Sequence, residues 1–292
     1  MKKTFILAAL LAGVFAAQPA SAWSGWGHKL IADIAEKHLT PEAKAEIERY
    51  IHGSIVDDAA WMDRVASWNR SKSHIAGWEQ TSWWHMYTIG PDGRPDSRRA
   101  YNGDGDLLPN LEKCIGNLKN FRELTDSAVV INLRCVVHMI GDMHCPSHVY
   151  YTEFPDVFSR PKPKDPNEKR ITRYDQFPLT YEGKPKRYHG LWDGLSIRAV
   201  YPELGEEFEP YVRKLDKWSK KKIAKACEGT VEEWAMENAR NCRAIYDWAK
   251  PGDNIDRSFF VEHQELSKSQ LVKAAYRLAH TLNGIFGQPT AD

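Results

Sequence analysis

The chain has 292 residues, of which 42% are hydrophobic, 27% are charged and 11% are aromatic. This composition is typical of a folded globular protein, and it excludes a disordered, fibrous or low-complexity chain. The formal net charge at pH 7 is only +1. No overall excess of charge therefore indicates a polyanionic partner, and any such attraction must be local.

The N-terminal segment has the pattern of a secretory signal peptide. Lys2 and Lys3 precede an apolar run over residues 5–17, which is too short for a bilayer-spanning helix of roughly 20 apolar residues. The run leads into Ala20-Ser21-Ala22, the small-x-small pattern of a cleavage site. The sequence therefore predicts that residues 1–22 are removed, and that the mature chain begins at Trp23 and is secreted or periplasmic.

Helical periodicity dominates the mature chain. Thr40 and Pro41 supply an N-cap and a first helical residue, and an apolar stripe at helical spacing stops near Gly141. Alternating strand patterns are scarce, so we expect a single all-α domain over residues 23–292, with its helices packed around one core. The predicted helical stretches cover residues 30–35, 41–51, 129–140, 208–226, 231–248 and 266–285.

Residues 160–187 depart from this pattern. The stretch holds five prolines and nine Lys or Arg residues against four Asp or Glu residues. Such a composition is poorly suited to a regular core element, so we expect an exposed insertion loop. The sequence leaves two interpretations open, a solvated insertion or a basic flap over a site that receives anions.

The cysteines limit the possible cross-links. In an oxidising compartment five cysteines can form at most two disulfides and leave one free thiol, and the sequence does not reveal the pairing. No CxxC motif is present, which argues against a thiolate zinc ribbon and against thioredoxin-like redox chemistry. The cysteines are Cys114, Cys135, Cys145, Cys227 and Cys242.

Histidine and aspartate recur at a spacing that suits a metal site. His138 and Asp142 are four residues apart on the apolar-striped helix, so their side chains project from the same face one turn apart. His148 follows beyond a proline that should end the helix and bring this third ligand back. His189 and Asp193 repeat the four-residue spacing in a second segment. Zinc takes imidazole and carboxylate ligands from several elements, so these residues predict a metal centre.

The predicted mature N-terminus could contribute a further ligand. A new α-amino group on Trp23 has a pKa near 8, low enough for a metal ion to displace its proton. Gly25 and Gly27 allow the backbone to fold tightly. The amine and carbonyl of Trp23 could therefore chelate one ion together with His28.

Taken together, these segments resemble the S1/P1 nucleases, which share a fold with the bacterial zinc-dependent phospholipases C. The matching segments span nearly all of the mature chain in the order of the family, and nine ligand positions hold the expected residue types. The segments are Trp23 with His28, Ala59-Ala-Trp-Met-Asp63-Arg64, Trp84-His85, Val137-His138-Met-Ile-Gly-Asp142-Met-His-Cys-Pro-Ser-His148, His189-Gly-Leu-Trp-Asp193 and Trp234-Ala-Met-Glu-Asn.

The resemblance implies three Zn²⁺ ions and assigns their ligands. Asp142 would bridge two of the ions, because a carboxylate has two oxygens and offsets part of the repulsion between the metals. The first ion would be held by Asp63, His85, His138 and Asp142, the second by His148, His189 and Asp193, and the third by Trp23, His28 and Asp142.

Such a cluster is suited to phosphoester hydrolysis. The zinc charges exceed those of the carboxylates, so the site should attract phosphate. Bound zinc ions would lower the pKa of a water between two of them so that it could attack phosphorus near neutral pH, and the remaining zinc would stabilise the leaving oxygen. Asp63, a ligand beside that water, could also orient it as a catalytic group. The resemblance implies an endonuclease and 3′-nucleotidase that releases 5′-phosphorylated products from single-stranded DNA or RNA.

Two other functions remain open from the sequence. One is a phospholipase C that uses the same metals on a lipid phosphodiester, and the other is a non-catalytic zinc-binding envelope protein. The phospholipases place the first His well over a dozen residues beyond the terminal Trp and end the second-zinc motif in Glu. Here His28 follows Trp23 by five residues and the motif ends in Asp193. Both features favour the nuclease, which we expect to be a monomer without stable membrane association.

The substrate-binding positions depart from the family pattern. The fungal and plant nucleases commonly carry an aromatic residue after the His85 position and an acidic or amide residue three positions beyond it. This chain has Met86 and Thr88 there, so base preference, and DNA against RNA preference, stay undetermined. Tyr151 is a further candidate for stacking on a base. His144 is two residues past Asp142, off its helix face, so we expect an indirect role or none.

Overall fold

The computed structural model describes residues 23–65, 81, 84–96, 106–153, 158–159 and 175–287. The predicted signal peptide lies outside the described residues, and so do residues 160–174 of the predicted insertion loop. The helices are α1 (Ser24–Lys37), α2 (Pro41–Ile51), α3 (Ile55–Asp58), α4 (Trp61–Val65), α5 (Leu107–Lys119), α6 (Asp126–His144), α7 (Tyr188–Gly194), α8 (Ser196–Val200), α9 (Glu209–Leu215), α10 (Lys220–Ala226), α11 (Val231–Cys242), α12 (Ile245–Trp248), α13 (Arg257–Glu262) and α14 (Gln264–Phe286), with 3-10 turns at Phe121–Glu123 and Pro202–Leu204.

Capping residues begin several helices where the sequence predicts them. The Thr40 hydroxyl accepts the backbone N–H of Ala43 at the start of α2, with Pro41 in the first helical position as predicted. Thr125 caps α6 in the same way. Helix α6 continues past Gly141 and ends at His144, because the residue before Pro146 takes an extended backbone conformation.

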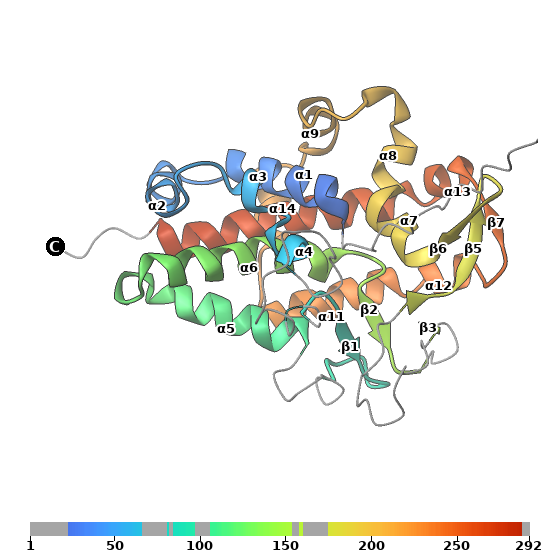
Figure 1. The fold of residues 1–292 in the computed structure, drawn as a ribbon, viewed down its shortest axis with the longest axis horizontal. Helices are drawn as coiled ribbons and strands as arrows, with labels where there is room; N and C mark the ends of the chain where they lie inside the picture. Colours follow the sequence, from blue (N-terminus) through green and yellow to red (C-terminus); the bar gives the residue numbers. More distant parts are fainter. Residues whose placement is uncertain are drawn as a thin grey trace, which may run out of the picture.

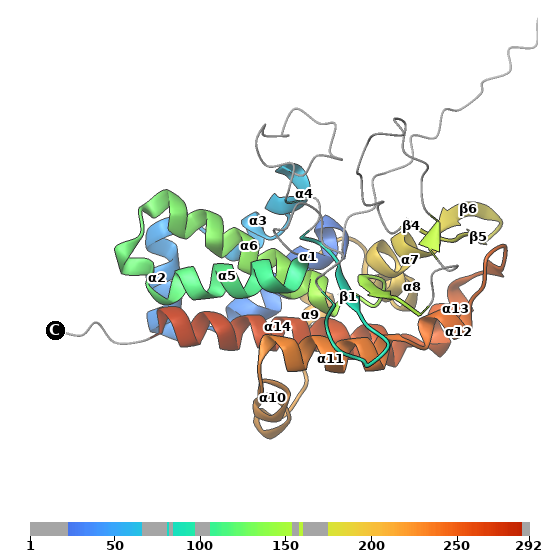
Figure 2. The ribbon, with the colours of Figure 1, turned by 90° about the horizontal axis from the view of Figure 1, so that it is seen from below.

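Of the helices in the described residues, α14 is the longest, and it runs along the long axis of the molecule (Figures 1 and 2). It contacts α1, α2, α6, α8, α10 and α11. Its buried side chains join those of the other helices in one hydrophobic cluster that extends from Trp23 to Phe286. The prediction of an all-α fold is confirmed. Among the described residues, no helix is both long enough and apolar enough to span a bilayer.

The prediction of one continuous helix over residues 208–226 is wrong. Helix α9 ends at Leu215 and α10 starts after Ser219, whose hydroxyl accepts the backbone N–H of Lys222. Asp216, in the break, binds the His38 imidazole and accepts the Tyr276 hydroxyl. These tertiary contacts and the cap end one helix and begin the next, and Figure 2 shows α10 projecting from the rest of the molecule. The predicted stretch 231–248 is likewise divided, between α11 and α12.

The strands are short and lie at one end of the helices (Figure 1). Strands β1 and β2 are parallel, β3 and β4 are antiparallel, and a three-stranded sheet has the order β6-β5-β7. In this sheet β6 is antiparallel and β7 parallel to β5. The strands are β1 (Tyr87–Ile89), β2 (Val149–Tyr151), β3 (Phe158–Ser159), β4 (Asp175–Gln176), β5 (Pro178–Tyr181), β6 (Lys184–Arg187) and β7 (Asn254–Ile255).

The last part of the predicted insertion loop over residues 160–187 is a hairpin, so the expectation of a loop is wrong there. Glu182 and Gly183 both have positive φ, at 49° and 72°, which is typical of a two-residue hairpin turn. Phe177 and Leu179 are buried and anchor β5, whereas all four residues of β6 are exposed. The basic composition of this stretch therefore appears on an exposed strand that leads directly into α7.

Candidate metal centre

Nine predicted ligand residues lie in the described part of the chain, and all nine are buried. The most exposed of them, His189, has a relative exposure of 7%. Helix α6 contacts both α1 and α4, and α1 contacts α7, which brings their polar residues together. Pairing of β1 with β2 places the segment that precedes β1 beside the turn after α6. The residues come from α1 (Trp23 as its N-cap, His28), α4 (Asp63), the turn before β1 (His85), α6 (His138, Asp142), the turn after α6 (His148) and α7 (His189, Asp193).

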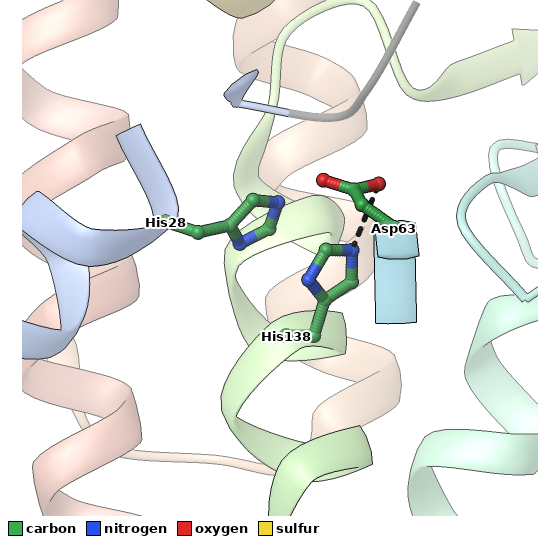
Figure 3. A group of neighbouring side chains, drawn as sticks. All are labelled: His28, Asp63 and His138. Atoms are coloured by element: carbon green, nitrogen blue, oxygen red, sulfur yellow. Dashed lines mark ion pairs between the residues drawn. The ribbon is translucent and has the colours of Figure 1, made fainter. Parts of the chain in front are cut away.

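A first group of four donors converges between α4, α6 and the turn before β1. Asp142 Oδ2 lies 2.9 Å from His85 Nδ1 and 3.2 Å from His138 Nε2, and these two nitrogens are 3.1 Å apart. Asp63 Oδ1 lies slightly farther away, 3.7 Å from His138 Nε2 and 3.8 Å from His85 Nδ1. Figure 3 shows Asp63 and His138 facing each other, with His28 beside them. We call these four residues the first group.

A second group of three donors converges between α7 and the turn after α6. His148 Nε2 and His189 Nε2 are 2.9 Å apart. Asp193 Oδ2 lies 2.9 Å from His189 Nε2, and Asp193 Oδ1 lies 3.2 Å from His148 Nε2. We call these three residues the second group.

His28 forms a third position on the other side of Asp142. Its Nε2 lies 3.0 Å from Asp142 Oδ1, and its ring stacks on that of His138 with centroids 3.8 Å apart. The ring also lies directly over Gly141, where a Cβ atom would be only 2.8 Å from His28 Nδ1. The Trp23 carbonyl accepts the backbone N–H of His28 at 3.1 Å. The glycine in α6 therefore allows α1 to present His28 to the site, with Trp23 one turn away.

Asp142 connects the first group with His28. Its Oδ2 faces His85 and His138, whereas its Oδ1 faces His28. The side chain is fully buried. Each oxygen of one carboxylate thus belongs to a different set of nitrogens, which is the arrangement that a bridging ligand requires.

Backbone carbonyls set the orientation of two imidazoles. His138 Nδ1 donates to the Ala59 carbonyl at 2.8 Å, and His148 Nδ1 donates to the His85 carbonyl. With Nδ1 protonated, the Nε2 lone pair of each ring points into the site. Metal-binding histidines are commonly fixed in this way by a carbonyl on the outer nitrogen.

Burial controls the charges in the first group. Desolvation lowers the pKa of His85 well below its ordinary value, and repulsion from His138 adds to this effect. Desolvation also lowers the pKa of His138, against the attraction of Asp63. Neutral imidazole is the form that binds a metal ion. Desolvation raises the pKa of Asp142 well above its ordinary value, so the folded protein disfavours this carboxylate unless a cation compensates its charge.

Asp193 in the second group behaves differently. Burial alone would raise its pKa, but the charges of His189 and His148 outweigh burial and lower it. The second group is therefore partly compensated internally, whereas Asp142 is not.

The donor set fits zinc. Neither oxygen of Asp142 and only one oxygen of Asp193 accepts a hydrogen bond from the described residues, although all of these atoms are buried. Zinc bonds to nitrogen and oxygen are about 2.0–2.2 Å long, so donors on one tetrahedral ion lie about 3.3 Å apart. The donor separations of 2.9–3.8 Å in the first group, and of 2.9–3.2 Å in the second, are close to that value. His28, Asp63 and His138 also form a triad whose potential ligand atoms lie within 4.8 Å of one another.

The predicted substrate-binding residues differ in how accessible they are. Met86 is half-buried and directly follows His85, whereas Thr88 is buried on β1. Tyr151 is buried on β2, and its hydroxyl donates to the Ala239 carbonyl at 2.6 Å. These positions favour Met86 over Tyr151 as a group that a base could reach, and contact with substrate stays a prediction for all three.

All five cysteines are free thiols in the structure, so it contains none of the disulfides that the sequence allows. Cys114 on α5 and Cys135 on α6 hydrogen-bond to each other, which lowers the pKa of Cys114 and, together with burial, raises that of Cys135. Cys145 contacts the second group instead, as does Ser147, whose proximity the sequence did not indicate. The only feature of the sequence that could have indicated this contact is that Ser147 directly precedes His148.

Comparisons with known proteins point in one direction. The family model described as S1/P1 Nuclease matches residues 23–287. The chain is 25% identical to Nuclease S1 of Aspergillus oryzae, over 94% of this chain and 95% of that protein. It is 24% identical to Endonuclease 4 of Arabidopsis thaliana, over 90% and 89% of the two chains, and 24% identical to Endonuclease 2 of the same plant, over 94% of each.

Proposed function

The chain belongs to the S1/P1 nuclease family and is a hydrolase that cleaves nucleic acid, and we propose that its buried donors hold three zinc ions. The first group would bind one ion, the second group another, and Trp23, His28 and Asp142 the third. The single observation that carries the proposal is the division of the Asp142 oxygens between the first group and His28. One carboxylate in that position is suited to join two metal ions.

The residues around these donors have distinct roles in the proposed reaction. Zinc, when bound, supplies a Lewis acid that activates water near neutral pH and stabilises the charge of a leaving oxygen. Asp63 is the carboxylate placed farther from the imidazoles of the first group. Its oxygens are therefore suited to accept a hydrogen bond from the attacking water and to orient it toward phosphorus. Met86, half-buried next to His85, is suited to contact a base.

We propose that the substrate is single-stranded DNA or RNA and that the products carry 5′-phosphates, with 3′-nucleotidase activity as well. The mature protein would begin at Trp23 after removal of residues 1–22, and it would act as a secreted or periplasmic monomer. The start of the family match at residue 23 supports this maturation site.

The test of the proposed function compares three substrates with and without a metal chelator. Single-stranded DNA and RNA should be cleaved to 5′-phosphorylated products, the chelator should abolish cleavage, and added zinc should restore it. A phosphatidylcholine emulsion should release no phosphorylated head group. Hydrolysis of the lipid alone would establish a phospholipase C. Full zinc content with no hydrolysis of any phosphoester would establish a non-catalytic zinc protein.

The role of Trp23 has a separate test. A protein that carries one extra residue before Trp23 should lose one zinc ion per chain and most of its activity, because the amine becomes a peptide nitrogen. The matched control is the same preparation cleaved so that Trp23 comes first. Full zinc content and activity in the extended protein would show that the amine is not a ligand.

A further inference from the structure

The carboxylate of Asp193 is held differently at its two oxygens. Its Oδ1 lies 3.0 Å from the Cys145 thiol and 3.3 Å from the Ser147 hydroxyl, and both groups can donate to it. Its Oδ2 accepts no hydrogen bond from any residue in the described ranges and lies 2.9 Å from His189 Nε2. The two donors of the turn after α6 therefore both face Oδ1, which also lies 3.2 Å from His148 Nε2, whereas Oδ2 faces His189 without such a donor.

The turn after α6 places both donors. The Cys145 backbone N–H donates to the Asp142 carbonyl at 3.0 Å, and the Cys145 carbonyl accepts the backbone N–H of His148, also at 3.0 Å. The Ser147 hydroxyl also lies 3.4 Å from the His189 carbonyl. Cys145 and Ser147 are both completely buried, so water does not compete for these contacts. One short turn is thus attached by its backbone to two predicted ligands and by its side chains to a third.

We propose that Cys145 and Ser147 are positioning residues that hold Oδ1 of Asp193 and thereby present Oδ2 to the zinc ion of the second group. This inference rests on the zinc site of the proposed function, but it does not depend on hydrolysis. Carboxylates that bind metals are themselves hydrogen-bonded, and loss of such partners typically lowers metal affinity 10–100-fold. The proposal assigns the Cys145 thiol as a hydrogen-bond donor to Oδ1 and not as a zinc ligand, although its Sγ lies within 4.8 Å of potential ligand atoms of His148 and Asp193.

The experiment measures zinc binding by the full mature chain in competition with a chromophoric chelator. The double variant Cys145→Ala/Ser147→Ala should bind one zinc ion per chain about tenfold or more weakly, while the remaining zinc binds as in the wild type. Cys145→Ser should restore most of the affinity, because a hydroxyl still donates to Oδ1. A merely structural role would give no such rescue and would weaken all zinc ions together.

The matched control is Cys242→Ala. Cys242 is also a completely buried thiol with polar partners, Asn238 and Gln270, but it lies on α11 and contacts no predicted ligand. This variant should lose some stability and keep its zinc affinity. If the double variant does not fold, Ser147→Ala alone should show a several-fold weaker single zinc.

Two results would overturn the inference. One is unchanged zinc affinity in folded Cys145→Ala/Ser147→Ala. The other is a cobalt–sulfur charge-transfer band in the cobalt-loaded wild type that disappears in Cys145→Ala, since this would make Cys145 a ligand. Failure of the proposed function gives a different pattern, in which zinc affinity responds as described but no nucleic acid is cleaved.

Discussion

Two buried polar clusters include residues of α6, and they differ in whether their polar atoms find hydrogen-bond partners within the protein. The first comprises the donors around Asp142, where acceptor atoms face one another and both Asp142 oxygens lack a hydrogen bond from the described residues. The second surrounds Arg277, which is 2% exposed. Arg277 donates to the Ala226 carbonyl and to His144 Nε2, at 2.8 Å each, and to the Glu237 carboxylate.

The difference is clearest between two histidines of the same helix. His144 donates from Nδ1 to the Ile140 carbonyl and accepts from Arg277 at Nε2, so both of its nitrogens are used within the protein. Desolvation and the charge of Arg277 lower the pKa of His144, which keeps it neutral. His138 also has a carbonyl partner at Nδ1, but its Nε2 faces other acceptors. A closed network of this kind is structural, whereas convergent acceptors need a cation.

The largest effect is expected from removing the charge of Asp142, whose two oxygens face different histidines. Asp142→Asn should lower the rate of nucleic acid cleavage by roughly a thousandfold or more, because metal ions contribute several kcal/mol to such reactions. In chelator the variant should be at least as stable as the wild type, since burial raises the pKa of Asp142 and the charged form costs more stability as pH rises. Zinc content, cleavage rate and chemical denaturation test these points. A near-normal rate would contradict the bridging role.

The opposite outcome, a loss of stability with unchanged zinc affinity, is expected for the closed network of hydrogen bonds around Arg277. Arg277→Met removes the cation from a buried cluster and leaves His144 and the Ala226 carbonyl without a donor. A buried polar group left without its hydrogen-bond partner in this way costs about 1–3 kcal/mol of unfolding free energy. Zinc affinity of the folded variant should be unchanged. The control is Lys273→Met, which removes the other cation bound to Glu237 and should cost less, because that pair is more exposed. Loss of zinc from Arg277→Met at unchanged stability would show that the Arg277 network supports the metal site and not the fold.

The sequence predicts which residues belong to the cluster around Asp142 better than it predicts how they are arranged. His138 and Asp142, and likewise His189 and Asp193, are four residues apart, so local helix geometry alone places each pair on one face. The separation of His144 from the site follows from the same geometry. The division of the Asp142 oxygens depends instead on where α1 crosses α6, and that crossing is a tertiary property.

The parts of the fold that the sequence did not predict also depend on tertiary contacts. The break between α9 and α10 is stabilised by partners of Asp216 that lie far away in the chain, His38 and Tyr276. The hairpin in the basic stretch depends on Glu182 adopting a positive φ before Gly183, although glutamate rarely does so. Residue composition correctly indicated exposure of β6 and did not reveal its pairing.

An intermediate effect is expected where α1 crosses α6. In Gly141→Ala the new Cβ would lie 2.8 Å from His28 Nδ1 and 3.0 Å from His28 Cε1, so the ring must move. Overpacking of this kind costs about 1–3 kcal/mol, and displacement of His28 should weaken one zinc ion. The matched control is Gly116→Ala on α5, where a Cβ would meet no atom within 4 Å. That change should raise stability by up to about 1 kcal/mol. Equal behaviour of the two variants would show that the close approach does not position His28.

The smallest effect is expected at Glu237, the partly exposed member of the network around Arg277. Burial alone would raise the pKa of Glu237, but hydrogen bonds from Lys273 and Arg277 and their charges lower it to about 2. Because this value lies below the ordinary 4.5, the carboxylate stabilises the fold above pH 4.5, and that contribution is lost as pH falls toward 2. The side chain is 34% exposed, so solvent screening should limit the contribution to about 1 kcal/mol.

Chemical denaturation of the wild type and of Glu237→Gln at a series of acidic pH values measures this contribution. The difference in unfolding free energy should shrink as pH falls through that range, and it should be the same with zinc and with chelator. A difference that does not change with pH would mean that Glu237 acts by packing alone. A difference that appears only with zinc would mean that the two clusters on α6 are coupled, and the contrast between a closed network and an open metal site would then no longer hold.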